Sequence, residues 1–567
     1  MISRLDSIVS TKTVWTNLLM KPIKLIITGL LILLLFSCSK PQKVQQPGCV
    51  AEEITTSNNN AIVETQSGKV VGYVDNDIYV YKGIPYAEAE RFMPPHLPQP
   101  WDGIRSSRAY GPVCPQGKRT GWYSDEQAFA FDWDDGYQDE NCLRVNIWTQ
   151  GINDNKNRPV MVWLHGGAYS SGSSQELPSY DGTALCKKGD VVVVSLNHRL
   201  NVLGFLDLSA FGEKYASSGN VGLLDLVAAL EWVQNNIRQF GGDPGNVTIF
   251  GQSGGGGKVS TLMVTPAAAG LFHKAIVESG SLLNIMESKY SRQIGLATME
   301  ELNIKATEID YLNKIPYEKL LEAGNNAIRK IQKIADVEGF KALLFGWAPT
   351  VDGNILPLQP SHPKAMEQSK DIPLVVGSTL HEFTSSTYNP TLRNIDKEGA
   401  IAEIQKKYGD KTGEFLFAFK EAYPKYQPKD LLDVDFLFRP NVIKHATLKY
   451  GLQGAPVYTY LFTWESPVID GIFRSTHCME LPFVFHNISR CNKMTGGTPG
   501  AYQLAEKMSS AWLNFARNGN PNTPDLPNWE PYTTFRGATM IFDENCNIKY
   551  HHDRDLIEIV NSFPGRM

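Results

Sequence analysis

The 567-residue sequence lacks several features that would mark particular classes of protein. Its eight cysteines include no Cys-x-x-Cys pair, which argues against a zinc ribbon and a thioredoxin-like motif. The formal net charge is only −5, so the composition indicates no nucleic-acid partner. No internal repeat indicates a solenoid or a propeller, and no spacing of His, Cys, Asp or Glu indicates a metal site. We therefore expect neither a metal nor another cofactor.

The residues that are present are typical of a large globular protein. About 42% are apolar and 20% are charged, which is enough apolar material for a sizeable core. The 48 glycines and 33 prolines favour a fold with many tight connections over a helical bundle. No linker divides residues 62–563, so we expect residues 62–567 to form one domain.

A short apolar segment near the N-terminus has the form of an export signal. Lys21 and Lys24 precede the run Leu25–Phe36, which is about a dozen residues long and too short for a comfortable membrane span. Cys38 follows, and the whole resembles a bacterial lipoprotein signal. The resemblance implies that cleavage before Cys38 removes the signal peptide and that the Cys38 thiol carries lipid. An ordinary cleaved signal or a short anchor helix is the alternative, and Met20 is the expected true start.

The domain boundaries and the location follow from this signal. Residues 1–37 are the predicted signal peptide. Residues 38–61 are rich in Gln, Pro, Ser, Asn and Thr, which predicts a flexible tether. Two or more acyl chains on Cys38 would hold the protein firmly at a membrane. We expect an exported, lipid-anchored protein of the bacterial cell envelope, in the periplasm or at the outer membrane; its oligomeric state stays open.

The hydrophobic pattern of the main domain predicts a mostly parallel sheet. Residues 62–82 alternate in short β-rich pieces, which is typical of an antiparallel meander. The apolar runs 158–164 and 191–196 have the pattern of central strands that are buried on both faces. Strands that alternate with helices indicate an α/β fold with helices on both faces of the sheet. The helix-rich segments 284–345 and 390–450 are expected to form a cap.

The pentapeptide Gly251-Gln252-Ser253-Gly254-Gly255 has the Gly-x-Ser-x-Gly pattern of a nucleophile elbow. A strand pattern precedes it and a helix pattern follows. A serine on such a turn projects from the sheet, and the N-terminus of the next helix faces the developing oxyanion. The pentapeptide alone could instead form an anion-binding or flexible loop. It is not a Walker loop, because Val259 follows Lys258 where that motif needs Ser or Thr.

The sequence around the pentapeptide resembles the type-B carboxylesterase family, which includes bacterial para-nitrobenzyl esterases. Residues 240–255 are similar to the active-site signature of the family, and residues 139–147 are similar to its second signature. Residues 81–87 and 512–521 also match family segments. The resemblance implies an α/β-hydrolase fold and a carboxylic ester hydrolase that acts on a small-molecule ester through an acyl-enzyme.

The family order of serine, acid and histidine locates a catalytic triad around Ser253. The block around His477 resembles the histidine block of the family, which implies that His477 is the base. The block around Glu382 resembles the strand-then-acid block, which implies that Glu382 orients His477. Asp352 is the rival for the acid. Cys478 stands where the family commonly has glycine, and we interpret it as a tolerated small residue.

The resemblance also implies backbone donors for an oxyanion. His165-Gly166-Gly167-Ala168 follows a strand and resembles the oxyanion loop of the family. The implied donors are the N–H groups of Gly167, Ala168 and Gly254. Ser279 resembles a serine that supports the catalytic acid.

A disulfide between Cys114 and Cys142 is implied by the same resemblance, and it would close a surface loop. The aromatic residues of this loop either line the substrate site or simply pack the loop; they are Trp122, Tyr123, Phe129, Phe131 and Trp133. The pairing of the other cysteines stays open: Cys49, Cys186, Cys478, Cys491 and Cys546.

Gln252 is the residue that separates this chain from the cholinesterases within the family. Cholinesterases carry glutamate before the serine, near their cationic substrate, so neutral glutamine argues against a choline ester. Two alternatives to an ester hydrolase stay open. One is a non-catalytic binding protein like the neuroligins, which lack the complete triad. The other is the same machinery acting on an amide, a carbonate or an acyl-sugar. The sequence predicts no acyl or alcohol preference.

Overall fold

The computed structural model describes residues 54–57, 60–117 and 124–563. The predicted signal peptide, Cys38 and most of the predicted tether lie outside the described residues. None of the helices in the described ranges is both long and apolar enough to cross a membrane. The last part of the predicted tether contains strand β1 (Ile54–Thr55), which pairs antiparallel with β4 (Tyr73–Asp75). The sheet therefore begins earlier than the composition indicated.

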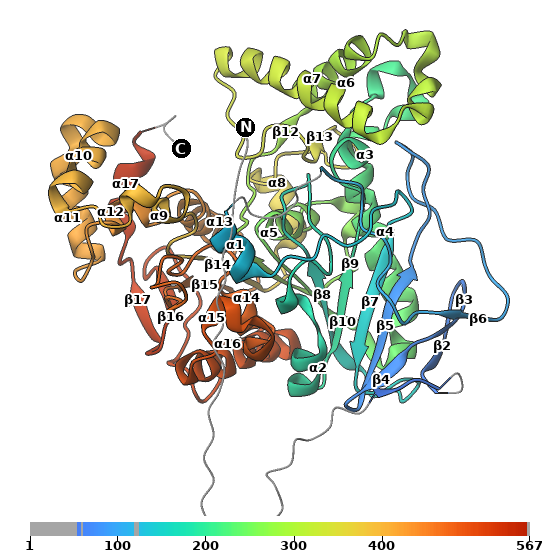
Figure 1. Cartoon of the computed structure of the whole chain (residues 1–567), viewed down its shortest axis with the longest axis horizontal. Helices are drawn as coiled ribbons and strands as arrows, with labels where there is room; N and C mark the ends of the chain where they lie inside the picture. The colour runs from blue at the N-terminus through green and yellow to red at the C-terminus, as the bar shows by residue number, and fades with distance from the viewer. Residues whose placement is uncertain (1–53, 58–59, 118–123, 564–567) are drawn as a thin grey trace, which may run out of the picture. The chain divides into compact units, whose positions relative to one another are not determined.

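A twelve-stranded sheet forms the centre of the domain (Figure 1). Its order is β1-β4-β5-β7-β9-β8-β10-β11-β14-β15-β16-β17. The parallel strands are β9 (Val192–Leu196), β8 (Arg158–Leu164), β10 (Gly242–Gln252), β11 (Lys274–Glu278), β14 (Leu374–Thr379), β15 (Val457–Phe462) and β16 (Ala538–Phe542). Antiparallel strands flank them, including β5 (Ile78–Pro85), β7 (Arg144–Thr149) and β17 (Asn547–Tyr550). The predicted α/β fold with a mostly parallel sheet is confirmed.

Alternate residues of the central strands pack into two separate cores, one on each face of the sheet. In β8, Val160 and Val162 belong to one core, and Met161 and Trp163 belong to the other. Each fully buried aliphatic side chain of this kind contributes roughly 1.5–3 kcal/mol. Helices that cover the first core include α4 (Val221–Asn236), α5 (Gly254–Leu262) and α13 (Arg439–Gly451). Helices α2 (Thr183–Gly189) and α16 (Pro499–Asn518) cover the second. This double cover explains why the strands are continuous apolar runs.

The segment predicted as one meander, residues 62–82, divides between two sheets. β2 (Ile62–Thr65) and β3 (Gly68–Val71) pair in a small sheet with β6 (Ile104–Ser106). The following strands, β4 and β5, pair in the main sheet. The chain changes sheets at Gly72, where a Cβ atom would lie 2.2 Å from the carbonyl oxygen of Val80. Only glycine permits this close approach of two backbones.

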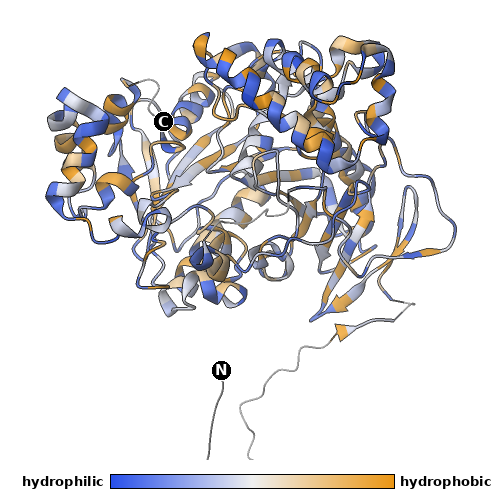
Figure 2. Ribbon diagram, turned by 45° about the horizontal axis from the view of Figure 1, so that its top comes forward, coloured by the Kyte–Doolittle hydropathy of each residue, from blue (hydrophilic) through white to orange (hydrophobic). Residues whose placement is uncertain are grey.

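Both segments predicted as a cap are helical. In residues 284–345, α6 (Ser288–Glu301) and α7 (Tyr317–Val337) pack on each other and join the first core. In residues 390–450, α10 (Lys397–Tyr408), α11 (Thr412–Ala422) and α12 (Asp430–Asp433) build a third core with α17 (Arg554–Asn561). The end of that segment, α13, covers the sheet instead. Along these peripheral helices, hydrophilic and hydrophobic residues alternate, as expected for helices with one buried face (Figure 2).

Short elements complete the connections. They are α1 (Asp125–Phe131), α3 (Asn201–Phe205), β12 (Met286–Glu287), β13 (Thr350–Val351), α8 (Pro363–Met366), α9 (Ser385–Tyr388), α14 (Leu481–Val484) and α15 (Asn492–Thr495). β12 and β13 pair with each other outside the main sheet.

A tight turn joins β10 to α5 at Ser253. Ser253 has φ 59° and ψ −126°, a conformation that costs a non-glycine residue roughly 1–3 kcal/mol. A Cβ atom on Gly251 would lie 2.6 Å from the carbonyl oxygen of Leu164, and one on Gly255 would lie 1.9 Å from the same oxygen. These two glycines therefore let the turn press against the end of β8.

The substitution Gly255→Ala is expected to destabilise the protein by about 3 kcal/mol or more, because the new methyl group overlaps the backbone at Leu164. Gly257→Ala, two residues later, is the matched control, because its Cβ would meet nothing closer than 3.5 Å. That control should be neutral or should stabilise the helix by up to about 1 kcal/mol. Urea unfolding measures both, and equal midpoints would contradict the packing described for the turn.

Candidate active site

Ser253 lies at the carboxyl end of β10, where the strand meets α5. Ser253 is half-buried, while its neighbours Gln252 and Gly254 are buried. The backbone is tied on both sides: Ser253 N–H donates to Glu278 O at 2.8 Å, and Gly257 N–H donates to Ser253 O at 3.0 Å. The carboxyl edge of an open parallel sheet is the usual place for a ligand site. The hydroxyl is thus presented on a rigid turn at this edge.

His477 and Glu382, which are 95 residues apart in sequence, form a hydrogen bond between Nδ1 and Oε2. Both side chains are buried. The other carboxylate oxygen, Glu382 Oε1, accepts from the backbone N–H of Thr379 at 2.9 Å. The backbone N–H of His477 donates to the backbone carbonyl oxygen of Glu382 at 2.8 Å. An ionised carboxylate only accepts hydrogen bonds, so Nδ1 carries the proton and Nε2 is left as the basic nitrogen. The structure thus brings together the two residues predicted as base and acid.

Asp352, the rival for the acid, has other partners. Its Oδ2 accepts from Asn220 Nδ2 at 2.8 Å, and its Oδ1 accepts from the N–H groups of Asn354 and Leu356 at 2.9 and 3.0 Å. These bonds close the turn after β13. Asp352 is a structural carboxylate, and among the described residues the carboxylate bonded to His477 is that of Glu382.

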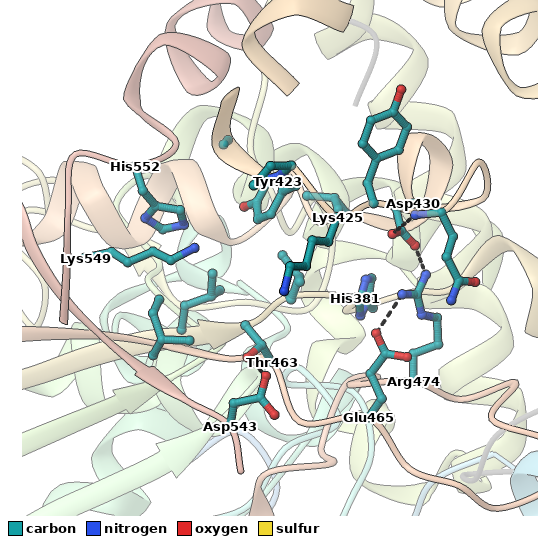
Figure 3. A pocket seen from close by; sticks show the side chains of 18 of the residues that line it. His381, Tyr423, Lys425, Asp430, Thr463, Glu465, Arg474, Asp543, Lys549 and His552 are labelled. Carbon is teal, nitrogen blue, oxygen red and sulfur yellow. Dashed lines mark hydrogen bonds and ion pairs between the residues drawn. The ribbon is translucent and has the colours of Figure 1, made fainter. Parts of the chain in front are cut away.

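His381, the residue before Glu382, borders a pocket. His381 Nδ1 lies 2.8 Å from Ser475 Oγ, and the ring borders a pocket of about 420 Å³ (Figure 3). In this pocket Arg474 bridges Asp430 and Glu465. His381 therefore has partners of its own, whereas the neighbouring Glu382 is bonded to His477.

Two aromatic rings pack beside the imidazole of His477. The Phe438 ring is stacked on it with centroids 5.4 Å apart and an interplanar angle of 16°. The Phe383 ring lies 4.9 Å away at 32°, and this residue is 40% exposed. Phe438 was not among the predicted site residues, because it lies inside the helix-rich segment 390–450 and belongs to no motif. Together these rings fix the plane of the imidazole and provide an apolar wall beside it.

The side chain of Gln252 points inward, toward His477. Its Nε2 lies 3.2 Å from His477 Nδ1 and 3.3 Å from His477 Nε2, and its Oε1 accepts from Cys478 Sγ at 3.1 Å. Gln252 is fully buried. Gln252 therefore contacts the histidine, and Cys478 is its second partner. The argument from its missing charge against a choline ester stays a prediction.

The loop predicted to bind an oxyanion lies directly against the serine turn. Gly167 and Ala168 have positive φ angles of 76° and 54°. A Cβ atom on Gly254 would lie 2.4 Å from Ala168 N, so these backbone segments are in direct contact. In the described part of the chain, none of the N–H groups of Gly167, Ala168 and Gly254 donates a hydrogen bond. The three predicted donors are thus close together and free to donate to a ligand oxygen.

Several buried carboxyl groups surround the acid. Burial, together with the charge of Glu382, raises the pKa of Asp435 to about 7. Burial raises the pKa of Glu278 to about 8, although Trp512 Nε1 donates to it at 2.7 Å. Burial and the charges of Glu382 and Glu278 raise the pKa of Glu480 well above its usual range. These shifts favour the neutral forms of the neighbours, which limits the repulsion of Glu382.

Ser279 is buried on the loop after β11, but it is not bonded to the acid. Its N–H donates to the carbonyl oxygen of Gly377 at 2.8 Å. No hydrogen bond joins Ser279 to Glu382 in the ranges that the structure covers. The structure thus connects Ser279 to strand β14, which leads to the acid, and its predicted support of Glu382 stays a prediction.

Cys114 and Cys142, the pair predicted to form a disulfide, are both buried and are free cysteines in the structure. The two are neighbours: a hydrogen bond with the Cys114 thiol, followed by burial, raises the pKa of Cys142 well above its usual range. Leu200 N–H also donates to Cys114 Sγ at 3.2 Å. The two thiols are therefore neighbours, and the disulfide between them stays a prediction.

The aromatic loop between these cysteines is described only in part. Trp122 and Tyr123 lie outside the described residues. Phe131 is 1% exposed and belongs to the second core, which fits the packing alternative for that residue. Phe129 is 51% exposed, with Lys493 Nζ 6.0 Å from its ring centroid.

Comparison with known proteins gives the same fold. A family model described as the carboxylesterase family matches residues 59–556. The chain is 36% identical over 499 residues to para-nitrobenzyl esterase of Bacillus subtilis, covering 86% of this chain and 96% of that protein. It is 33% identical over 523 residues to carboxylesterase 1E of Rattus norvegicus, covering 85% and 90%. A Clostridium hathewayi esterase that can hydrolyse aliphatic aromatic polyesters matches with TM-score 0.78 and 36% identity, covering 90% and 100%.

Replacement of Glu382 by glutamine is expected to lower kcat/KM for para-nitrophenyl acetate by about 10³–10⁴-fold, because an amide no longer holds His477 in the required tautomer. Asp352→Asn is the control and should change kcat/KM far less. Melting curves of both variants confirm folding. Near-normal turnover in Glu382→Gln, with the loss in Asp352→Asn instead, would assign the acid to Asp352.

Proposed function

The chain belongs to the carboxylesterase family and is a carboxylic ester hydrolase, and from this premise we propose that Ser253, His477 and Glu382 are its catalytic triad. The observation that carries the proposal is the hydrogen bond between His477 Nδ1 and Glu382. It holds an imidazole next to the strained turn of Ser253, with Gln252 of that turn in contact with the ring.

In the first half of the reaction, Ser253 Oγ attacks the ester carbonyl carbon and forms a C–O bond. His477 Nε2 takes the hydroxyl proton, and Glu382 stabilises the resulting imidazolium. The carbonyl electron pair moves onto oxygen. When the tetrahedral intermediate collapses, the bond to the alcohol oxygen breaks, and His477 gives its proton to that oxygen.

In the second half, a water molecule replaces the alcohol. His477 takes one proton from the water, whose oxygen attacks the acyl carbon. The bond to Ser253 Oγ then breaks, the serine recovers its proton from His477, and the carboxylic acid leaves. In both halves the anionic oxygen is bound by the N–H groups of Gly167, Ala168 and Gly254. One such donor is typically worth about 3 kcal/mol of barrier.

The surroundings of His477 support a preference for esters with apolar groups. Phe438 and the partly exposed Phe383 present aromatic faces beside the base. Gln252 is buried and carries no charge, and we keep the expectation that a choline ester is not the preferred substrate. We propose aromatic or aliphatic esters of small size as the substrates, in keeping with the para-nitrobenzyl esterase name of one relative.

The predicted location is a second part of the proposal. The run Leu25–Phe36 followed by Cys38 supports export, cleavage before Cys38 and lipid attachment at a bacterial envelope membrane. In that arrangement, the stretch between Cys38 and β1 would tether the hydrolase domain to the membrane surface.

Ser253→Ala removes the proposed nucleophile and should lower para-nitrophenyl acetate hydrolysis by at least about 10⁵-fold, since members of a triad act as a unit. It should also abolish covalent labelling by a fluorophosphonate. Ser260→Ala on the same helix is the control and should keep both, because Ser260 Oγ donates to Gly256 O at 2.9 Å within the helix. Persistent labelling of Ser253→Ala would reject this serine as the nucleophile.

Cys38→Ala tests the lipid anchor. In bacteria grown with labelled palmitate, wild-type protein should carry the label and fractionate with membranes, whereas Cys38→Ala should do neither. Cys49→Ala, a cysteine within the predicted tether, is the matched control and should behave as wild type. Equal labelling of all three proteins would refute the lipoprotein assignment.

A further inference from the structure

Lys258 is a buried lysine on α5 that no step of the proposed mechanism uses. It lies five positions after Ser253 and has no exposed surface. Its Nζ donates to the carbonyl oxygen of His165 at 2.8 Å and to that of Gly166 at 3.4 Å. Lysine is almost never fully buried unless it has a partner, because removing an ammonium from water is costly. The partners here are carbonyl groups of the loop that carries two of the oxyanion donors.

One of these carbonyl groups shares a peptide unit with a proposed oxyanion donor. The carbonyl of Gly166 and the N–H of Gly167 belong to one planar peptide unit, and in a trans unit they point in opposite directions. A cation at the carbonyl end draws electron density from the amide and strengthens its N–H dipole. Lys258 Nζ lies 3.4 Å from this Gly166 oxygen, which His165 Nδ1 also approaches at 3.0 Å, and 2.8 Å from the carbonyl oxygen of the preceding unit, that of His165.

No carboxylate forms an ion pair with Lys258 in the described ranges. The nearest acidic influence is Glu176, whose carboxylate is occupied by Ser173 N–H at 2.8 Å and Tyr180 OH at 3.1 Å. Burial lowers the pKa of Lys258 to about 7, and the charge of Glu176 opposes this shift. The Tyr169 ring lies 5.8 Å from Nζ. The closest hydrogen-bond acceptors of the ammonium are thus the two loop carbonyls.

Two histidines behind the loop are arranged as neutral neighbours. The rings of His165 and His198 are stacked with centroids 5.4 Å apart. Burial and the charge of Lys258 lower the pKa of both rings well below the usual range. Both imidazoles are thereby kept neutral. The charge of Lys258 therefore faces the peptide units of the loop without a second cation beside it.

We propose that Lys258 is a positioning residue for the oxyanion hole: its ammonium holds the peptide units at residues 165–167 in place and polarises the Gly167 N–H. This proposal rests on the proposed function, in which Gly167 is a donor to the anionic oxygen. The role is indirect, since Lys258 does not touch the reacting atoms. It predicts a loss of transition-state stabilisation with little change in ground-state binding.

The chain contains a matched lysine for comparison. Lys449 on α13 is also fully buried, and its Nζ donates to the carbonyl oxygens of Ser369 and Lys370 at 2.6 Å each. It thus combines the same residue type, burial and acceptors at a turn that carries none of the proposed catalytic groups. Any effect that is common to all buried lysines will appear at both positions.

The test compares Lys258→Met with Lys449→Met in the purified full-length protein. Lys258→Met should lower kcat by about 10–100-fold and weaken inhibition by an aryl trifluoromethyl ketone by the same factor, because the hemiketal formed with serine carries the oxyanion. KM should stay within about twofold. Lys449→Met should lower the melting temperature but change neither kcat nor the inhibition constant.

Lys258→Gln provides a second variant that can still donate a hydrogen bond but carries no charge. It should fold even where the methionine variant does not, and its kcat should lie between those of wild type and Lys258→Met. The proposal is overturned if folded Lys258→Met or Lys258→Gln has wild-type kcat. It is also overturned if kcat falls while the affinity for the trifluoromethyl ketone is unchanged.

Failure of the proposed function gives a different result. Ser253→Ala, measured in the same assay, would then retain hydrolysis, and both proposals would fall together. If Ser253→Ala is inactive and wild-type protein is labelled by a fluorophosphonate, normal activity in the Lys258 variants overturns only the role of the lysine.

Discussion

The contact between the turn at residues 251–255 and the end of β8 is the constraint on which the rest of the site depends. A Cβ atom on Gly251 or on Gly255 would overlap the carbonyl oxygen of Leu164. That contact holds Ser253 in a left-handed conformation that it would not keep alone. It also sets the distance between α5 and the loop after β8, and so brings Gly254 against Ala168.

Adjacent parallel strands deliver the other groups to the same edge. β8 leads to the oxyanion loop, β10 to Ser253 and β14 to Glu382, while His477 follows β15. Parallel strands end at a common edge, so groups from distant parts of the sequence meet there without a long loop. The core on each face fixes the strands, and through them the separation of the catalytic groups.

The acidic groups near Glu382 and the cation Lys258 lie at different parts of the active site. On the acid side, burial favours the neutral forms of Asp435, Glu278 and Glu480, so that repulsion with Glu382 is limited. On the oxyanion side, Lys258 donates to the loop carbonyls. A positive site behind the oxyanion loop and a negative site behind the imidazole match the charges that develop during acyl transfer.

The sequence by itself determined the local features: the apolar runs of the central strands, the helix after Ser253, and the turn whose glycines mark a close approach. Resemblance to a family pointed to Glu382 and His477, and the structure places them in contact. Only the tertiary structure decided that Gln252 faces His477, that Phe438 stacks on the imidazole, that Ile54–Thr55 joins the sheet, and that Lys258 reaches the loop carbonyls. The physical reason is the separation in sequence of the residues that interact. Periodicity and turn chemistry act between neighbours in sequence, whereas these contacts join segments whose approach depends on how the whole sheet packs.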